Sequence, residues 1–247
     1  MGAICSSSDV KQPEKPLVPP LSLEAFCQLK DNGALILDWR SYNTFHTGSG
    51  FIPGSLILQS CLSHGKAWCE FFIPKNTPLI LVLGGYLNEN EHIQTLLEWG
   101  YTVQGSLNGG FEAWVSAGYP VHKIKVLPYN NFESTVQAQK AKVVDVRHPD
   151  NWEEFGHIKD AQCIIRSEIL TRYNEIPRDQ PLYVHCISKQ FTVTIYSFLL
   201  RMGFTNLVGF IQGVDDFNYE VEWAAKCERI RIEEMMKNGG TIVVIAK

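Results

Sequence analysis

The sequence predicts an α/β protein made of two similar domains in tandem, each with a mostly parallel sheet flanked by helices. The chain has 247 residues, of which 45% are hydrophobic, enough to form two cores of moderate size. Short apolar runs typical of buried strands alternate with segments whose apolar residues recur at helical spacing, the pattern of a parallel sheet covered on both faces. The same landmarks occur twice, in the same order.

The internal repeat defines the two domains. Each copy has a strand-like run ending in Asp-x-Arg, then a Gly-x-Ile segment, then a glycine that ends a helical pattern, and finally a further glycine. The pairs are 34–40 with 141–147, 50–53 with 156–159, Gly100 with Gly203, and Gly110 with Gly213. Their offsets vary only between 103 and 107 residues. A nearly constant offset over four landmarks indicates a duplicated domain.

The domain limits follow from the repeat and from local composition. Within the second copy, 182–185 is expected to form a strand and 191–202 a helix that ends at Gly203. Residues 121–131, with Pro128 and two asparagines, are expected to link the domains. The predicted organisation is a tether over 1–20, a first domain over 21–123, a second domain over 130–224 and a tail over 225–247.

Charge and cysteine content exclude several classes of function. The net charge is −4, so the composition does not favour a nucleic acid partner. Seven cysteines are scattered without a CxxC pair, and an odd number of thiols without a secretory signal fits a reducing compartment. Cys61, His64 and Cys69 lack a zinc-like spacing, so we expect neither a metal nor an organic cofactor. The apolar runs are too short to cross a bilayer.

The first residues carry a lipidation signal. Gly2, followed by Ser6, fits the acceptor pattern for N-myristoylation, and Cys5 is a candidate palmitoylation site. One myristoyl chain binds a membrane only marginally, so stable anchoring needs the second acyl chain. We therefore expect a cytoplasmic lipoprotein, carrying myristate and palmitate, that a flexible Ser-, Pro- and Lys-rich tether holds at the cytosolic face of a membrane.

Together the landmarks resemble the rhodanese family. That family is recognised by an Asp-x-Arg that closes an early strand, a G-H-I-x-x-A segment, a cysteine loop and a late G-G-x-x-x-W stretch. The first copy supplies Asp38, Arg40, 50–55 and 109–114; the second supplies Asp145, Arg147, 156–161 and a weaker Gln212-Gly213. The resemblance spans residues 21–224 and implies two tandem rhodanese-like domains.

The loop after the predicted strand 182–185 is the candidate active site. It runs Cys186-Ile187-Ser188-Lys189-Gln190-Phe191-Thr192 and leads into the helical pattern. Backbone N–H groups at the start of a helix converge, and the helix dipole adds positive charge there. A thiolate at Cys186 should therefore be stabilised and reactive. Lys189 adds a cation that would attract an anionic sulfur donor.

The resemblance implies a sulfurtransferase that works through a persulfide. Cys186 would take a sulfur atom from a thiosulfate-like donor and pass it to a nucleophilic acceptor such as a thiol or cyanide. The backbone amides of residues 187–192 would hold the charge, with the Ser188 and Thr192 hydroxyls as further donors. Arg147 is a candidate donor ligand, although the sequence favours a structural ion pair between Arg147 and Asp145 at the strand end. Leu83 stands at the position of Cys186 in the first copy, so the first domain should be inactive.

The cysteine loop departs from the family pattern. Lys189 stands where active members often have glycine, and Phe191 is bulky enough to plug a pocket. Residues 148–152 lack the arginine that commonly binds the donor, which leaves His148 as the nearest substitute. These departures keep an alternative open: a catalytically silent, membrane-tethered binding or scaffold protein with a protein partner. The strand-like run 241–246 in the tail would suit such a role.

A cysteine phosphatase is a further reading of the same loop. His185-Cys186 resembles the start of the HCx5R loop of those enzymes. Their arginine grips phosphate through two parallel hydrogen bonds. Because Thr192 stands at that position, the sequence argues against phosphatase activity.

Overall fold

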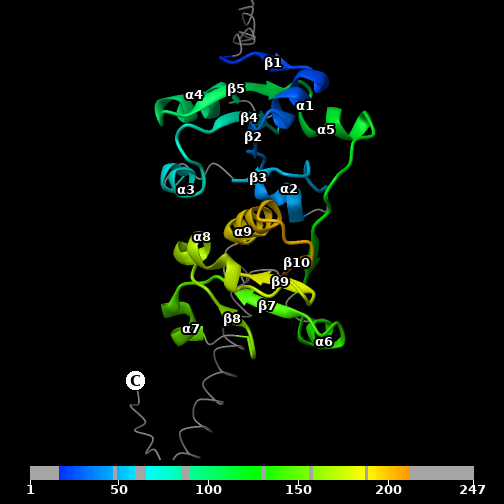
Figure 1. Cartoon of the computed structure of the whole chain (residues 1–247), viewed down its shortest axis with the longest axis vertical. Coiled ribbons are helices and arrows are strands. Elements are labelled where there is room, and N and C mark those ends of the chain that lie inside the picture. The colour runs from blue at the N-terminus through cyan, green and yellow to red at the C-terminus, as the bar shows by residue number, and fades with distance from the viewer. Residues whose placement is uncertain are drawn as a thin grey trace, which may run out of the picture.

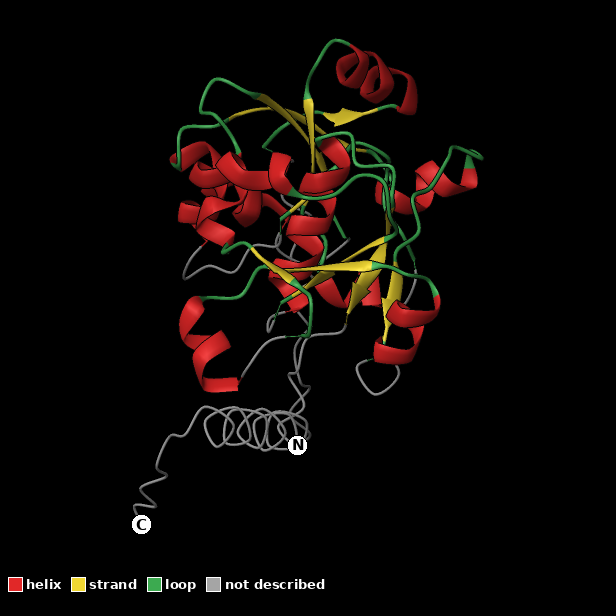
Figure 2. Ribbon diagram, turned by 60° about the horizontal axis from the view of Figure 1, so that its bottom comes forward, coloured by secondary structure: helices red, strands yellow, loops and turns green. Residues whose placement is uncertain are grey.

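A computed structural model describes residues 17–46, 49–58, 65–84, 89–128, 132–155, 158–186 and 189–211. Within these ranges the strands form two five-stranded sheets, and every neighbouring pair of strands is parallel. Helices flank both sheets (Figures 1 and 2). The predicted α/β fold class, with parallel sheets covered by helices, is confirmed.

The first sheet has the strand order β1-β5-β4-β2-β3. Its strands are β1 (Pro20–Leu21), β2 (Leu35–Asp38), β3 (Leu56–Ile57), β4 (Pro78–Val82) and β5 (Thr102–Leu107). The helices of this half are α1 (Leu23–Asp31), α2 (Tyr42–His46), α3 (Gly65–Phe72), α4 (Glu89–Glu98) and α5 (Gly110–Ser116).

The second sheet has the order β6-β10-β9-β7-β8. Its strands are β6 (Lys125–Leu127), β7 (Lys142–Asp145), β8 (Gln162–Cys163), β9 (Leu182–His185) and β10 (Leu207–Ile211). The helices are α6 (Phe132–Ala138), α7 (Pro149–Phe155), α8 (Ile169–Arg172) and α9 (Lys189–Arg201), with short 3-10 helices at Arg166–Glu168 and Tyr173–Glu175.

The two sheets repeat each other strand for strand. Counting strands within each half, both orders are 1-5-4-2-3. The register repeats as well: Asp38 pairs with Val82 between β2 and β4, and Asp145 pairs with His185 between β7 and β9. The duplication inferred from the landmarks is therefore present in the topology.

A strand of the second sheet lies within the segment predicted to link the two domains. The sequence assigned residues 121–131 to a linker because of Pro128 and the asparagines, but Lys125–Leu127 forms β6 and pairs with β10. The second sheet therefore begins at Lys125 rather than after residue 130. A three-residue edge strand gives almost no periodic signal, so only the pairing reveals it.

Local sequence explains the elements that carry the site. Strand β9 is buried at all four positions, as expected for a strand covered on both faces of a parallel sheet. Helix α9 begins at Lys189, two residues before the predicted start, and ends before Gly203. Gly203 has φ of 80°, and Phe204 N–H donates to Leu199 O at 3.2 Å. That left-handed glycine is the expected helix terminator.

Helix α9 lies between the two sheets (Figure 1). Every residue from 192 to 199 is buried, so the helix has no solvent-facing stripe along these turns. Ser197 Oγ accepts a hydrogen bond from Ile57 N–H in β3 at 3.0 Å and donates to Thr194 O at 2.9 Å. At the C-terminal end of the helix, Arg201 donates to Gly54 O of the first half at 2.6 Å. Helix α9 therefore packs against both halves of the chain.

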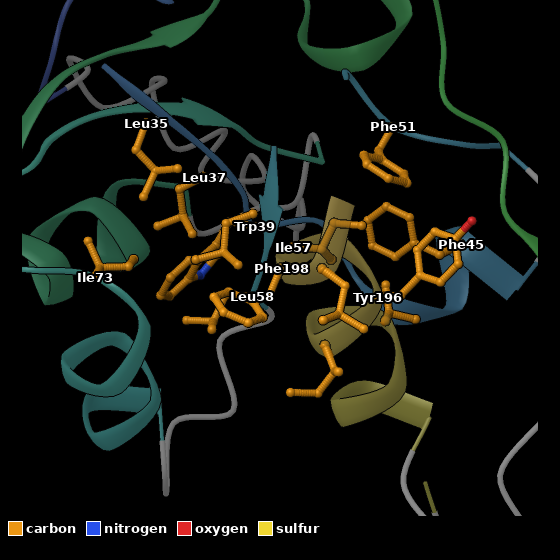
Figure 3. Close-up of a cluster of buried hydrophobic side chains, with 14 of the residues drawn as sticks. Leu35, Leu37, Trp39, Phe45, Phe51, Ile57, Leu58, Ile73, Tyr196 and Phe198 are labelled. Atoms are coloured by element: carbon orange, nitrogen blue, oxygen red, sulfur yellow. The ribbon is translucent and has the colours of Figure 1, made fainter. Parts of the chain in front are cut away.

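The apolar core is continuous across the two halves. In Figure 3, Tyr196 and Phe198 of α9 lie among side chains of the first half. Phe72 of α3 lies 5.5 Å from Phe198, centroid to centroid. One buried cluster contains residues from both sheets and α9: Leu35, Leu37, Trp39, Phe45, Ile57, Leu58, Val144, Val146, Cys186, Val193, Tyr196 and Phe198 among others.

Several predictions fall outside the described residues. These are the acylation sites Gly2 and Cys5, the loop residues Ile187 and Ser188, and the tail 225–247. In the part of the chain that the structure describes, no helix has the length and hydropathy needed to cross a membrane.

We expect Ser197→Ala to destabilise the whole protein rather than one half. The substitution leaves the Ile57 N–H buried without its acceptor, which costs about 1–3 kcal/mol. Urea unfolding followed by fluorescence and circular dichroism measures this loss. Because the core is shared, both probes should report one transition at a lower midpoint.

A matched control is Ser116→Ala, at an exposed serine on α5, which should change stability by less than about 0.5 kcal/mol. Two separate transitions, with only one of them moved by Ser197→Ala, would show that the halves fold independently.

Candidate functional site

The carboxyl ends of β7, β8 and β9 form one edge of the second sheet. Val146, just after β7, donates its N–H to His185 O at 2.9 Å and accepts from Arg166 N–H at 3.2 Å. Because Cys186 directly follows His185, the chain after β9 and the chain at Arg166 lie on either side of Val146. Ligand sites of parallel α/β sheets commonly lie at this edge.

Cys186 stands between the end of β9 and the start of α9. Its thiol is reduced and its side chain is 0% exposed. Two residues separate it from Lys189, where α9 begins, so the cysteine lies just ahead of a helix N-terminus. The side chains of Lys189 and Gln190 lie outside the described set, whereas Phe191 is partly buried and Thr192 is fully buried.

The other described thiols lack this setting. Burial raises the pKa of Cys69 to about 12, and Lys75 offsets little of this. Burial, together with nearby Asp145, raises the pKa of Cys163 to about 11. Both are protonated at neutral pH and are poor nucleophiles. Cys27 is partly buried within α1, and Cys163 is followed by a 3-10 helix, so of the described cysteines only Cys186 is separated by two residues from the start of an α-helix.

The Asp-x-Arg motifs are buried ion pairs. Arg147 donates to Asp145 from its backbone N–H at 3.1 Å, from Nε at 3.0 Å and from Nη2 at 2.7 Å. Arg40 binds Asp38 in the same way, at 3.2, 2.9 and 2.7 Å. Arg147 is 4% exposed. This geometry fits a structural role for Arg147, the role that the sequence favours over donor binding.

The second domain has a buried histidine, His185, where the first domain has an apolar residue. His185 is 2% exposed and pairs in register with Asp145, at the position where the first sheet has Val82. Burial lowers the pKa of His185 to about 4; Asp145 opposes this shift and Arg147 adds to it. The imidazole is therefore neutral at physiological pH.

A cation–aromatic stack covers the first turn of α9. The guanidinium of Arg166 lies 4.7 Å from the ring centroid of Phe191 and 5.9 Å from that of Trp68. The two rings are themselves 4.5 Å apart. Trp68 comes from α3, so the first half reaches the start of the helix that follows Cys186. Sequence analysis missed Arg166 because its ring partners are distant in the chain and it belongs to no motif.

His148, the predicted substitute for a donor-binding arginine, is poorly placed for that task. Its side chain is 54% exposed, and Nδ1 lies 3.2 Å from Asp150 Oδ2. A carboxylate at that distance already satisfies any positive charge on the ring and repels an anion.

The first half lacks a counterpart of the cysteine. Leu83, at the matching position after β4, is 6% exposed. Helix α4 then follows with Glu89 and Glu91 in its first turn. Two acids at a helix N-terminus neutralise the site that would hold an anion.

The second half is thus a parallel α/β domain with a cysteine at the carboxyl edge of its sheet, where such domains commonly bind ligands. Comparison with known proteins agrees: residues 130–218 match the family model described as a rhodanese-like domain. The chain contains a rhodanese-like domain at these residues.

Individual relatives are more distant. YqhL of Bacillus subtilis, an uncharacterized protein, is 44% identical over 48 residues, which are 19% of this chain and 37% of that protein. A thiosulfate sulfurtransferase from Pseudomonas aeruginosa is 17% identical over 81% of this chain and 44% of its own, with a TM-score of 0.35. SseA, a 3-mercaptopyruvate sulfotransferase from Escherichia coli, is 14% identical over 77% and 96%, with a TM-score of 0.34. Similarity at these levels does not extend to activity.

We expect the stability of the protein to fall between pH 6.5 and pH 4 because of His185. The unfolded chain protonates this histidine near 6.5, whereas the folded protein keeps it neutral down to about 4. The unfolded state therefore binds more protons in this window, and stability falls as the pH is lowered through it, by about 3 kcal/mol for this group.

The measurement is urea unfolding at several pH values for wild type and His185→Val, which installs the residue of the first sheet. The variant should have a distinctly flatter pH profile, although other groups keep it from being level. Parallel profiles for the two proteins would mean that His185 titrates alike in both states.

Proposed function

We propose that the protein is a sulfurtransferase that moves sulfane sulfur through a persulfide on Cys186. The observation that carries the proposal is the placement of this cysteine between β9 and α9 in a rhodanese-like domain. A helix N-terminus stabilises negative charge, and a persulfide, like a thiolate, is an anion. Of the described thiols, the two with raised pKa values are unsuited to the same task.

The reaction needs no outside oxidant. The Cys186 thiolate attacks the outer sulfur of thiosulfate; the S–S bond of the donor breaks and its electron pair leaves with sulfite. A cyanide ion or a thiolate then attacks the outer sulfur of the persulfide and leaves as thiocyanate or as a new persulfide. The electron pair of the broken bond returns to Cys186 as the thiolate. Backbone N–H groups of residues 187–192, with the Ser188 and Thr192 hydroxyls, are proposed to hold the charge.

Two observations favour a second function, a catalytically silent binding protein. The Cys186 side chain is 0% exposed, and Phe191 packs against Trp68 at the start of α9. To reach Cys186, a sulfur donor would have to pass the contact between Phe191 and Trp68 or the chain next to that contact. A protein that only binds a partner needs no such opening.

We further propose that the chain acts at a membrane, through myristate on Gly2 and palmitate on Cys5. The support is the acceptor pattern in the sequence and the need for two acyl chains in stable anchoring. Gly2→Ala should move the protein from the membrane fraction of cells to the soluble fraction. Unchanged partitioning would remove both the anchor and the assignment to the cytosolic face.

The first test is intact mass spectrometry of the protein after incubation with thiosulfate. We expect wild type to gain the mass of one sulfur atom, and cyanide to remove it. Cys186→Ser should gain nothing, whereas Cys163→Ser, a matched control at the partly buried thiol that ends β8, should behave as wild type.

The competing outcome is equally specific. If wild type forms no adduct and Cys186 resists a small alkylating agent, the thiol is closed off and the silent binding protein is the correct description.

A further inference from the structure

Of the side chains predicted to bind an anionic donor, Arg147 and His148 are poorly placed for that task, and that of Lys189 lies outside the described set. The Nε and Nη2 groups of Arg147 donate to Asp145, and Nδ1 of His148 lies beside the carboxylate of Asp150. A backbone cradle alone would bind a dianion such as thiosulfate weakly, because charge-assisted hydrogen bonds are about twice as strong as neutral ones. A cation near the Cys186 loop is therefore needed for the reaction proposed above.

Arg166 is held at the required edge of the sheet by its backbone and by its side chain. Its N–H bonds to Val146 O, one strand away from the residue that precedes Cys186. Its guanidinium rests against the ring of Phe191, five residues after Cys186 and in the first turn of α9. The two anchors fix the charge beside the helix N-terminus.

The charge of Arg166 is not neutralised by its neighbours. Among the described residues, no carboxylate or carbonyl oxygen lies within hydrogen-bond distance of its guanidinium. Glu168, two residues away on the same 3-10 helix, is taken up by Arg172 at 2.7 Å. Arg172 also binds Glu175 at 2.7 Å. The nearby acids are thus paired elsewhere.

The aromatic partners leave the donors of Arg166 usable. A ring face attracts a guanidinium without consuming its in-plane N–H groups. Arg166 is partly exposed, so those groups remain within reach of a small anion. By contrast, the stacked guanidinium of Arg40 is 2% exposed and bound to both Asp38 and Gly50 O.

We propose that Arg166 binds the anionic end of the sulfur donor and gives the Cys186 site its preference for anions. This inference rests on the proposed sulfur transfer for its substrate but not for its geometry. The substrate class is a small sulfane-sulfur compound with a sulfonate-like or carboxylate-like end. The planar guanidinium matches such oxygen pairs through two parallel hydrogen bonds.

The test compares Arg166→Gln with Arg166→Lys in the full-length protein. Rates of persulfide formation are measured over a range of thiosulfate concentrations. Arg166→Gln should raise the half-saturating concentration by about tenfold or more, and Arg166→Lys should restore part of the loss. Arg178→Gln is the matched control, since Arg178 also stacks on a ring, that of Phe204 at 3.7 Å, but precedes β9 whereas Cys186 follows it.

A second pair of reagents separates charge recognition from sulfur transfer. Methyl methanethiosulfonate is uncharged and its 2-sulfonatoethyl analogue is anionic; either one forms a mixed disulfide with the thiolate and releases methanesulfinate. Peptide mass spectrometry gives both rates at Cys186. Arg166→Gln should slow the anionic reagent about tenfold or more relative to the uncharged one.

Each outcome decides between the two proposals. If wild type forms no persulfide but Arg166→Gln lowers the ratio of anionic to uncharged rates, the anion site stands and sulfur transfer fails. If wild type forms the persulfide and Arg166→Gln changes neither the half-saturating concentration nor the ratio, sulfur transfer stands and Arg166 is not the ligand. If Lys189→Gln alone changes the ratio, the cation is Lys189. If neither reagent reaches Cys186, both proposals fall.

Discussion

The burial of α9 between two sheets is the constraint on which the rest of the structure depends. A helix at the edge of a domain exposes one face, but residues 192–199 of α9 are all buried. Such a helix is stable only if both of its sides are covered, so neither half of the chain has a complete core without the other. Its polar residues must also be satisfied internally, and Ser197 does this by accepting the Ile57 N–H of β3. The two halves are therefore one packing unit.

This constraint links the candidate site to the half that lacks a cysteine. Two residues separate Cys186 from α9, and what packs along the helix sets the position of the helix N-terminus. The first half supplies much of that packing: Trp68 and Phe72 contact Phe191 and Phe198, and β3 binds Ser197. Trp68 also lies beside Arg166. The half without a cysteine at the matching position thus helps to position the helix that follows Cys186.

The sequence was informative where the signal is local or repeated. Strand 182–185, the glycine that ends α9 and the duplicated Asp-x-Arg motifs could be predicted because hydrophobic runs and special backbone angles leave marks in adjacent residues. Strand β6 could not, since three residues next to a proline read as linker until β10 is placed beside them. Arg166 could not either, because its role depends on Trp68, which is distant in sequence and belongs to the other half. Features made by tertiary contact have no periodicity to detect.

The repeat also indicates how one scaffold diverged. At matched positions the first sheet has Val82 and Leu83, and the second has His185 and Cys186. The first half places Glu89 and Glu91 at the start of its helix, whereas the second has Arg166 resting against the first turn of α9. Cys186 and Arg166 suit the second half to the anion binding proposed for it, whereas Leu83 is buried and Glu89 and Glu91 place acids at the start of α4 in the first half. The Asp-x-Arg pair is the same in both, which is expected if that pair maintains the fold and the loop decides the function.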